Sequence, residues 1–391
     1  MGTQQKDSTT TAPVTTWQPR RRRVIKIVVI ALLILLLLSG GALFGVSYYF
    51  SSQILQVIHY TPTYDTRVLS VSAQEVRLQR VGDVMHPGEF EIEWPAGQAI
   101  VGPVISSDAT SVTRQLLQTT STLAAGTLVY WTRNVYTGQL MNNLGLRISE
   151  VNVPDALGNM PAWYVPGKLN TWAILVHGRG TDRNETLRYF PTLAKLGFPL
   201  LAISYRNDIG APASPDGFNH LGDTEWQDVE AAVKYALTQG AQHVVIFGWS
   251  QGGAVVESFI HRSSLAHDVL ALVLDSPILN WRATLVHQTE QRGLPDFLTS
   301  PAEAVATIRA GINFDALDQS NQAQPAIPML LFQGAADSTT PPSVADAFAA
   351  AHPDLVTYIR VAGTEHTEEW NTNPQVYASE LTAFLTQRLG L

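Results

Sequence analysis

Cysteine is absent from this chain of 391 residues. The absence excludes disulfide bonds, a cysteine nucleophile and thiolate metal sites. Charged residues are also scarce, at 15% of the chain, and the sequence shows no internal repeat. Hydrophobic residues, by contrast, make up 45%, which is enough apolar material for a sizeable core. The sequence therefore predicts a folded protein of two or three structural units.

Positive charge is concentrated at one end of the chain. Six basic residues and one acid give residues 1–26 a net charge of +5, so the remaining residues carry −13 of the formal total of −8. An acidic body repels the phosphate backbone of nucleic acids. We therefore expect no nucleic-acid partner, while the composition leaves the oligomeric state open.

One long apolar run covers residues 27–50. As a helix it would rise about 36 Å, enough to cross a hydrocarbon core of roughly 30 Å. Arg20–Arg23 precede the run, so the positive-inside rule places the N-terminus in the cytoplasm. We predict a disordered basic tail over residues 1–23, a single-pass anchor in the cell membrane over residues 24–50, and an extracytoplasmic body. A cleaved signal peptide and a buried core helix are the alternatives, which the length of the run and its flanking arginines disfavour.

The rest of the chain divides into two parts. Residues 51–150 contain alternating stretches such as Val68–Ser72 and Phe90–Trp94, which indicate a β-rich accessory region. In residues 151–391, short apolar runs alternate with helical stretches, which predicts an α/β fold with a doubly wound, mostly parallel sheet. The expected strands are 173–176, 200–203, 244–247, 270–274, 329–332 and 356–361, and the expected helices are 185–196, 225–239, 252–261 and 342–351.

The motif Gly248-Trp249-Ser250-Gln251-Gly252 lies between an apolar strand and a helical stretch. This is the G-x-S-x-G pattern in the strand–turn–helix context that presents a serine nucleophile. Glycine is needed at positions 248 and 252 because side chains there would crowd a sharp, strained turn. We predict Ser250 as the nucleophile, with Gly248 and Gly252 shaping its turn.

A serine hydroxyl needs a general base, and the base needs an acid. His366 follows the last predicted strand, and Asp337 follows the strand before it, so the chain order is serine, acid, histidine. We predict His366 as the base and Asp337 as the acid that fixes its tautomer. Asp275, at the end of an earlier strand, is the rival for the acid and is otherwise a structural or pocket residue near the site.

A second glycine-rich turn, His177-Gly178-Arg179-Gly180, follows another apolar strand. Such a turn lets a backbone N–H point at a developing oxyanion, and we predict the N–H groups of Arg179 and Gln251 as the two donors. The Arg179 side chain either binds an acidic substrate group or forms a structural ion pair. His177 is expected to be a structural hydrogen-bonding residue.

Together these residues resemble the α/β-hydrolase superfamily over about residues 150–391, and most closely its serine aminopeptidase-like and acylglycerol-lipase-like branch, which includes membrane-tethered members. The resemblance implies a lid inserted over about residues 279–324, whose apolar side chains either line an acyl pocket or pack a small cap. It also implies that Asp228 is structural. Trp249, Arg179 and Trp281 are candidates for substrate contact.

We expect a membrane-anchored serine hydrolase that cleaves an ester or amide through an acyl-enzyme and is carboxylesterase-like or lipase-like. Its partners would be a small-molecule ester, lipid or peptide substrate and the lipid bilayer through residues 24–50. No metal or organic cofactor is expected. The alternatives are a serine peptidase or an acyltransferase using the same triad, or a non-catalytic binding module that keeps the fold.

Overall fold

The computed structural model describes residues 1–3 and 18–391. The prediction of a disordered tail over residues 1–23 therefore falls largely on residues 4–17, which lie outside the described residues. A helix begins at Gln18 and ends at Leu55, so the basic stretch belongs to the same helix as the apolar run. Arginine is a good helix former and proline is tolerated in a first turn, which accounts for this early start.

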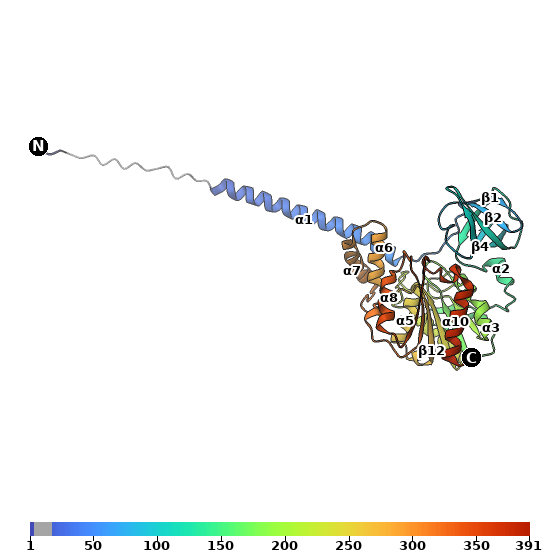
Figure 1. Ribbon diagram of the computed structural model, residues 1–391. Helices are drawn as coiled ribbons and strands as arrows, with labels where there is room; N and C mark the ends of the chain where they lie inside the picture. The colour runs from blue at the N-terminus through green and yellow to red at the C-terminus, as the bar shows by residue number, and fades with distance from the viewer. Residues whose placement is uncertain (4–17) are drawn as a thin grey trace.

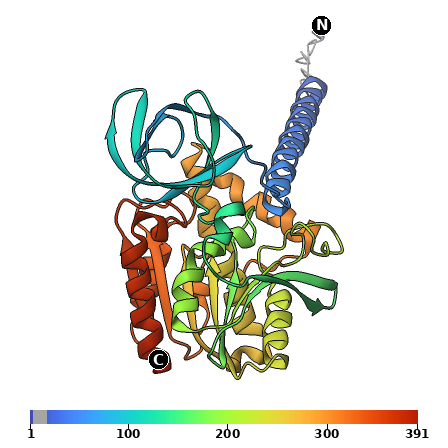
Figure 2. The same cartoon turned by 90° about the vertical axis from the view of Figure 1, so that its right-hand side faces the viewer.

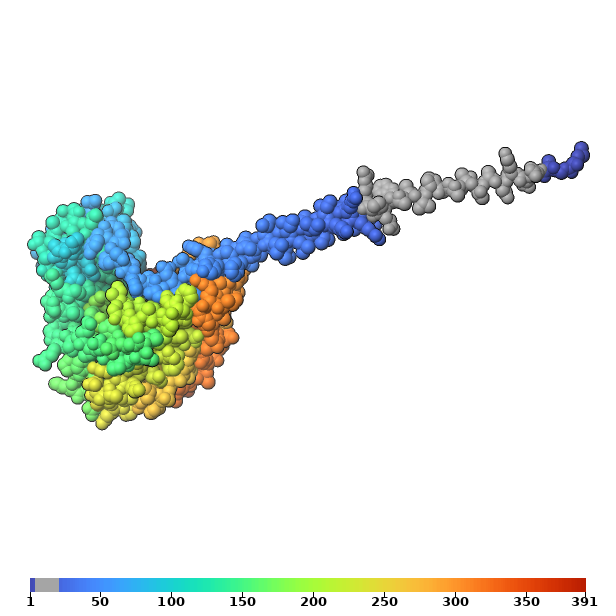
Figure 3. Space-filling model, turned by 180° about the vertical axis from the view of Figure 1, so that it is seen from behind, coloured from blue at the N-terminus to red at the C-terminus, as the bar shows by residue number. Residues whose placement is uncertain are grey.

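Helix α1 (Gln18–Leu55) projects from the body as a long rod (Figures 1 and 3). By length and composition the stretch Arg21–Leu55 could cross a membrane, with a mean hydropathy of 3.0 in its most apolar window. None of that window is buried against the protein, which excludes the core-helix alternative. Burial begins at Ser47, so only the last two turns of α1 pack on the body.

A closed, antiparallel β-barrel follows α1 in the order β1-β2-β5-β4-β3-β6. Its strands are β1 (Thr66–Val71), β2 (Glu75–Gln79), β3 (Phe90–Trp94), β4 (Gly97–Ser107), β5 (Ser111–Thr119) and β6 (Leu128–Thr132). Alternate side chains such as Val76, Leu78 and Phe90 point inward and form its core. The β-rich region expected over residues 51–150 is thus a barrel, whose strands span only residues 66–132.

The main sheet has eight strands in the order β14-β13-β12-β11-β9-β10-β8-β7. They are β7 (Ser149–Asp155), β8 (Gly158–Val165), β9 (Thr171–Val176), β10 (Leu200–Ile203), β11 (His243–Trp249), β12 (Val269–Asp275), β13 (Met329–Gly334) and β14 (Val356–Val361). The six from β9 to β14 are parallel and match the six expected runs. Strands β7 and β8 form an antiparallel edge hairpin that the apolar-run criterion does not detect, because Glu150 and Asn152 are exposed.

Helices cover both faces of the sheet, as a doubly wound architecture requires. One core joins α4 (Trp226–Thr238), α5 (Gln251–Arg262) and α8 (Pro342–Ala351) to the sheet. The other joins α3 (Phe190–Leu196) and α10 (Pro374–Leu389). The shorter helices are α2 (Gly138–Asn142), α9 (Glu369–Thr372), η1 (Arg183–Tyr189), η2 (Ser264–Asp268), η3 (Asp296–Leu298) and η4 (Gln319–Asn321).

The barrel lies over one end of the sheet, opposite the C-terminus (Figure 2). Its contact with the segment after β14 is close: the Glu89 N–H donates to the Asn371 carbonyl at 2.8 Å. A Cβ on Gly88, whose φ is +103°, would lie 1.8 Å from that same carbonyl oxygen. Only glycine fits this approach, so the barrel is held tightly against the loop that carries His366.

The insertion over residues 279–324 contains α6 (Trp281–Gln291) and α7 (Thr299–Ala310). Helix α7 packs along the last turns of α1. Ile54, Leu55 and Phe314 belong to one buried apolar cluster between them. The insertion therefore supports the end of α1. Its apolar side chains pack a small cap, which is the second of the two alternatives for this segment.

Candidate active site

Ser250 stands on a strained turn between β11 and α5. Its φ of +51° lies in a region that non-glycine residues rarely adopt, and its side chain is nearly buried, at 8% exposure. A Cβ on Gly252 would lie 2.1 Å from the Val176 carbonyl, and one on Gly248 would lie 2.8 Å from the Gly252 carbonyl. The two glycines thus allow the tight passage of the chain that lifts Ser250 above the sheet.

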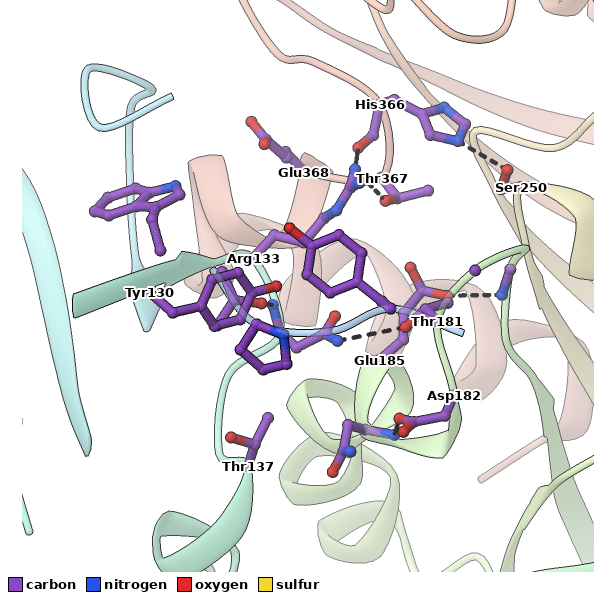
Figure 4. Close-up of a pocket in the computed structure, with 18 of the residues that line it drawn as sticks. Tyr130, Arg133, Thr137, Thr181, Asp182, Glu185, Ser250, His366, Thr367 and Glu368 are labelled. Atoms are coloured by element: carbon purple, nitrogen blue, oxygen red, sulfur yellow. Dashed lines mark hydrogen bonds between the residues drawn. The ribbon is translucent and has the colours of Figure 1, made fainter. Parts of the chain in front are cut away.

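Ser250, His366 and Asp337 come together in one chain of hydrogen bonds. His366 Nε2 lies 2.8 Å from Ser250 Oγ (Figure 4), and His366 Nδ1 lies 2.8 Å from Asp337 Oδ2. A carboxylate at Nδ1 favours the tautomer with the proton on that nitrogen, which leaves Nε2 to accept the serine proton. The three side chains follow β11, β14 and β13, whose carboxyl ends meet at one edge of the sheet.

Asp337 is held as a carboxylate by its surroundings. The Thr339 and Thr340 N–H groups donate to its Oδ1 at 2.8 and 2.7 Å, and the Thr340 hydroxyl and Gln333 amide donate to its Oδ2. Burial alone would raise the pKa of Asp337, but attraction to His366 and these hydrogen bonds outweigh it and hold the pKa well below the usual value. The group is therefore suited to orient His366.

Asp275, the rival acid, lies beneath the nucleophile turn and is not bonded to His366. Its carbonyl accepts the Ser250 N–H at 3.0 Å, and its carboxylate accepts the Tyr189 hydroxyl at 3.2 Å. Beside it lies Glu369, whose pKa is raised well above the usual value by burial and by the charge of Asp275. Nothing in the sequence identified Glu369, because a carboxyl group in a polar loop gives no sign of such burial.

The glycine-rich turn after β9 lies against Ser250. A Cβ on Gly178 would be 3.1 Å from the Ser250 Cβ, and the Gly178 N–H donates to Glu185. Within the described residues, the N–H groups of Arg179 and Gln251 donate to no acceptor. Both are thus available to an oxygen atom bound next to Ser250.

His177 supports this turn from below. Its Nε2 lies 2.7 Å from Asp208 Oδ2, and its ring stacks on Tyr205. Burial lowers the pKa of His177, but the charge of Asp208 and the hydrogen bonds outweigh burial and raise it to about 9. Asp228, in α4, forms a buried pair with Arg206 at 2.8 Å.

The three side chains considered for substrate contact have other partners. Trp249 is 1% exposed and donates to the Tyr189 hydroxyl, and Trp281 is 3% exposed and donates to the Leu221 carbonyl. Neither lines the cavity, which corrects that expectation: Trp249 packs in a core of the sheet and Trp281 in the apolar cluster of the insertion. The Arg179 guanidinium donates to backbone carbonyls at the end of α1 and forms no ion pair within the described residues.

A cavity of about 730 Å³ opens above Ser250 and His366 (Figure 4). Its other walls come from the barrel, the segment after β6, the linker after α1, the glycine-rich turn after β9 and the loop of His366; they include Tyr60, Glu93, Tyr130, Arg133, Thr137, Asp182 and Glu368. No residue of the insertion over residues 279–324 lines it. The expectation of a lid over residues 279–324 is therefore corrected, because the barrel covers the site instead.

The barrel also contacts the loop of His366 directly. Arg133 Nη1 donates to the His366 carbonyl and to Thr367 Oγ1, as Figure 4 shows. His86 Nδ1 lies 2.8 Å from Glu368, a hydrogen bond that raises the pKa of His86. Sequence reasoning missed these residues, because strand alternation predicts a barrel but not where the barrel docks.

The lining of the cavity is polar and rich in carboxyl groups. Glu93 and Asp182 face it without forming an ion pair within the described residues, and burial raises the pKa of Glu93. The two arginines of the lining, Arg133 and Arg179, donate to backbone carbonyls instead. In the part of the chain that the structure describes, no group of three or more His, Asp or Glu side chains could hold a metal ion.

Comparisons with known proteins agree with this architecture. The sequence profile of the prolyl oligopeptidase family matches residues 188–390, and a profile described as a domain of unknown function, DUF8805, matches residues 67–132. No curated protein matches by sequence.

Among solved structures, the esterase Pf2001 of Pyrococcus furiosus is 18% identical with a TM-score of 0.51, over 63% of this chain and 93% of that chain. Est1E of Butyrivibrio proteoclasticus, solved with ferulic acid, is 14% identical with a TM-score of 0.47, over 62% of this chain and 100% of that chain. At these identities the first likeness shows a shared α/β-hydrolase fold.

Proposed function

This chain belongs to the prolyl oligopeptidase family of serine hydrolases, and from that premise we propose that Ser250, His366 and Asp337 form its catalytic triad. The observation that carries the proposal is the continuous hydrogen-bonded chain from Ser250 Oγ through both ring nitrogens of His366 to a buried carboxylate. A binding module that merely kept the fold would need neither this alignment nor the strained serine turn.

The proposed reaction is acyl transfer in two steps. His366 accepts the Ser250 proton as the hydroxyl attacks an ester or amide carbonyl. The Arg179 and Gln251 N–H groups stabilise the oxyanion, and losing one such donor would cost about 2.7–4 kcal/mol of barrier. His366 then gives the proton to the leaving group, and water activated by the same ring releases the acyl group from Ser250.

The substrate is proposed to be small and polar. Tyr60, Glu93, Asp182 and Glu368 give the cavity walls that hydrogen-bond to hydroxyl and amide groups but offer no long apolar channel. A long acyl chain would have to desolvate these carboxyl groups without replacing their hydrogen bonds. The lipase-like part of the expectation is therefore replaced by a hydrolase of short-chain or polar esters.

A peptidase is the second candidate, and one observation favours it. Glu93 and Asp182 line the cavity without a cationic partner within the described residues, and burial chiefly, with a smaller contribution from the charge of Asp182, raises the pKa of Glu93. A substrate ammonium group beside Glu93 would favour its ionised form. Peptides with a free amino terminus carry such a group.

We also propose that α1 anchors the protein in a membrane. The helix is exposed along its apolar length, and basic residues at its start would place the N-terminus in the cytoplasm and the hydrolase outside. The burial of Ile54 and Leu55 in the body supports a helix that stays attached, and not a cleaved signal.

The substrate proposal is tested with two series of compounds and the purified full-length protein in detergent. We expect nitrophenyl acetate and butyrate to be hydrolysed at least about tenfold faster than the palmitate, and Ser250→Ala to hydrolyse none of them. Aminoacyl anilides with free and acetylated amino groups test the peptidase candidate. A preference for the palmitate would contradict the proposed substrate class, and faster cleavage of free-amine anilides than of any ester would favour the peptidase.

A further inference from the structure

The backbone and the side chain of Arg179 lie in different surroundings. Its backbone belongs to the turn that lines the cavity with Ser250 and His366. Its side chain leaves the cavity and ends at the C-terminus of α1. There Nη2 donates to the carbonyl oxygens of Gln53, Ile54 and Gln56 at 2.9, 2.8 and 2.8 Å. One residue thus joins the proposed oxyanion turn to the end of the anchor helix.

The chemistry at the helix end explains why an arginine stands there. The last carbonyl groups of a helix have no N–H partner within it and carry the negative end of its dipole. A guanidinium satisfies several of them at once. Burial lowers the pKa of Arg179 to about 10, which leaves it charged at neutral pH. Because no carboxylate pairs with it within the described residues, these carbonyls are the main partners of a half-buried cation.

The end of α1 is itself fixed to the body. Leu55 is fully buried, and its carbonyl accepts the Asn219 N–H at 2.9 Å. Arg309 of α7 donates to the Ser51 and Ser52 hydroxyls at 2.8 and 2.7 Å. Arg179 therefore contacts a rigid support.

The oxyanion turn is held at Gly178 by the hydrogen bond from its N–H to Glu185, and its other end is a second glycine. It contains Gly178 and Gly180, and Gly180 has a φ of +70°. A Cβ on Gly180 would lie 3.2 Å from Ile58 in the linker that follows α1. The turn is thus flanked by the helix end and its linker on the side away from the sheet.

We propose that the C-terminal turn of α1 positions the oxyanion turn through the Arg179 side chain, so that catalysis depends on the docking of the anchor helix. The inference rests on the proposed function and deepens it. The Arg179 side chain is a positioning group, because it acts on the reacting atoms only through its own backbone N–H. A shift of that N–H by about 1 Å would weaken its bond to the oxyanion and leave substrate binding largely intact.

The test compares Arg179→Met with Arg77→Met in the full-length protein in detergent. Both variants remove a guanidinium, but Arg77 is an exposed residue of the barrel that pairs with Asp108 and contacts neither α1 nor the oxyanion turn. We expect Arg179→Met to lower kcat roughly 10–100-fold with KM changed less than about threefold, and Arg77→Met to keep kcat within about threefold of wild type. Arg179→Lys, which keeps a cation at the carbonyls, should restore part of kcat.

Two results would overturn the inference: an unchanged kcat in Arg179→Met, or an equal loss of kcat in Arg77→Met. Should Arg179→Met fail to fold, Arg179→Gln, which also removes the cation, is read in the same way: a lowered kcat at near wild-type KM supports the inference, and a wild-type kcat overturns it. Labelling of wild-type Ser250 by a fluorophosphonate separates the two proposals. An unlabelled wild type would refute the function itself, whereas a labelled wild type with an undiminished Arg179→Met refutes only the role of the helix.

Discussion

The pKa values of two buried carboxyl groups, those of Asp337 and Glu91, are shifted in opposite directions by the neighbouring groups. Asp337 lies beside His366 and receives several hydrogen bonds, so its pKa falls despite burial. Glu91 of the barrel is fully buried without a cation, and burial raises its pKa to about 8 although Thr137 donates to it. The difference shows that the groups next to a carboxyl group influence its protonation more than the extent of its burial does.

Glu91 makes stability depend on pH. Between its ordinary pKa of 4.5 and its folded value of about 8, the folded protein holds a proton that the unfolded chain has lost. Stability should therefore fall as pH rises through this window, by at most about 1.4 kcal/mol per pH unit. We expect the melting temperature to drop by several degrees between pH 5 and pH 8, and Glu91→Gln to show a smaller drop.

The control for this prediction is Glu75→Gln, which removes an exposed acid from the same barrel. Its melting temperature should follow that of the wild type at every pH. An equal slope in Glu91→Gln and wild type would show that Glu91 does not retain its proton in the folded protein.

At the scale of elements, the sequence predicted the features that follow from hydrophobic periodicity and from short motifs. Buried apolar runs identified all six parallel strands, and the turn around Ser250 was found because strained turns demand glycine. The edge hairpin β7–β8 was missed, since its exposed polar residues break an apolar run. The docking of the barrel was also unpredictable, because contacts such as Arg133 with His366 join residues that are far apart in the chain.

The insertion between β12 and β13 illustrates the same limit. Its apolar side chains indicated a buried surface, and that much is found in the cluster with Ile54 and Leu55. Hydrophobicity alone does not say whether a surface covers a substrate or another helix. Here the apolar surface covers another helix, because α7 packs on α1 and the barrel lines the cavity.

At the scale of the whole molecule, three parts of the chain converge on one cavity. The hydrolase fold supplies Ser250, His366 and Asp337, the barrel covers them, and the segment after α1 forms a further wall. The barrel and α1 both leave the body at the same end (Figures 2 and 3). The barrel, the linker and the hydrolase fold therefore all border the space that a substrate would occupy.

The proposed orientation predicts the outcome of proteolysis on intact cells. A protease added outside should degrade the hydrolase part, and an alkaline carbonate wash should leave the full chain in the membrane fraction, because α1 spans the bilayer. A cytoplasmic protein of the same cells serves as the control for intactness. Full protection of the hydrolase until the cells are lysed would contradict the orientation, and release by carbonate would contradict the anchor.

The identity of the nucleophile is tested most directly by fluorophosphonate labelling followed by peptide mapping. The account predicts one adduct on the peptide that contains Ser250, no labelling in Ser250→Ala, and normal labelling in Ser258→Ala, which removes a buried serine of α5, the helix that follows Ser250. A wild-type protein that stays unlabelled, or a Ser250→Ala variant labelled as fast as wild type, would contradict it.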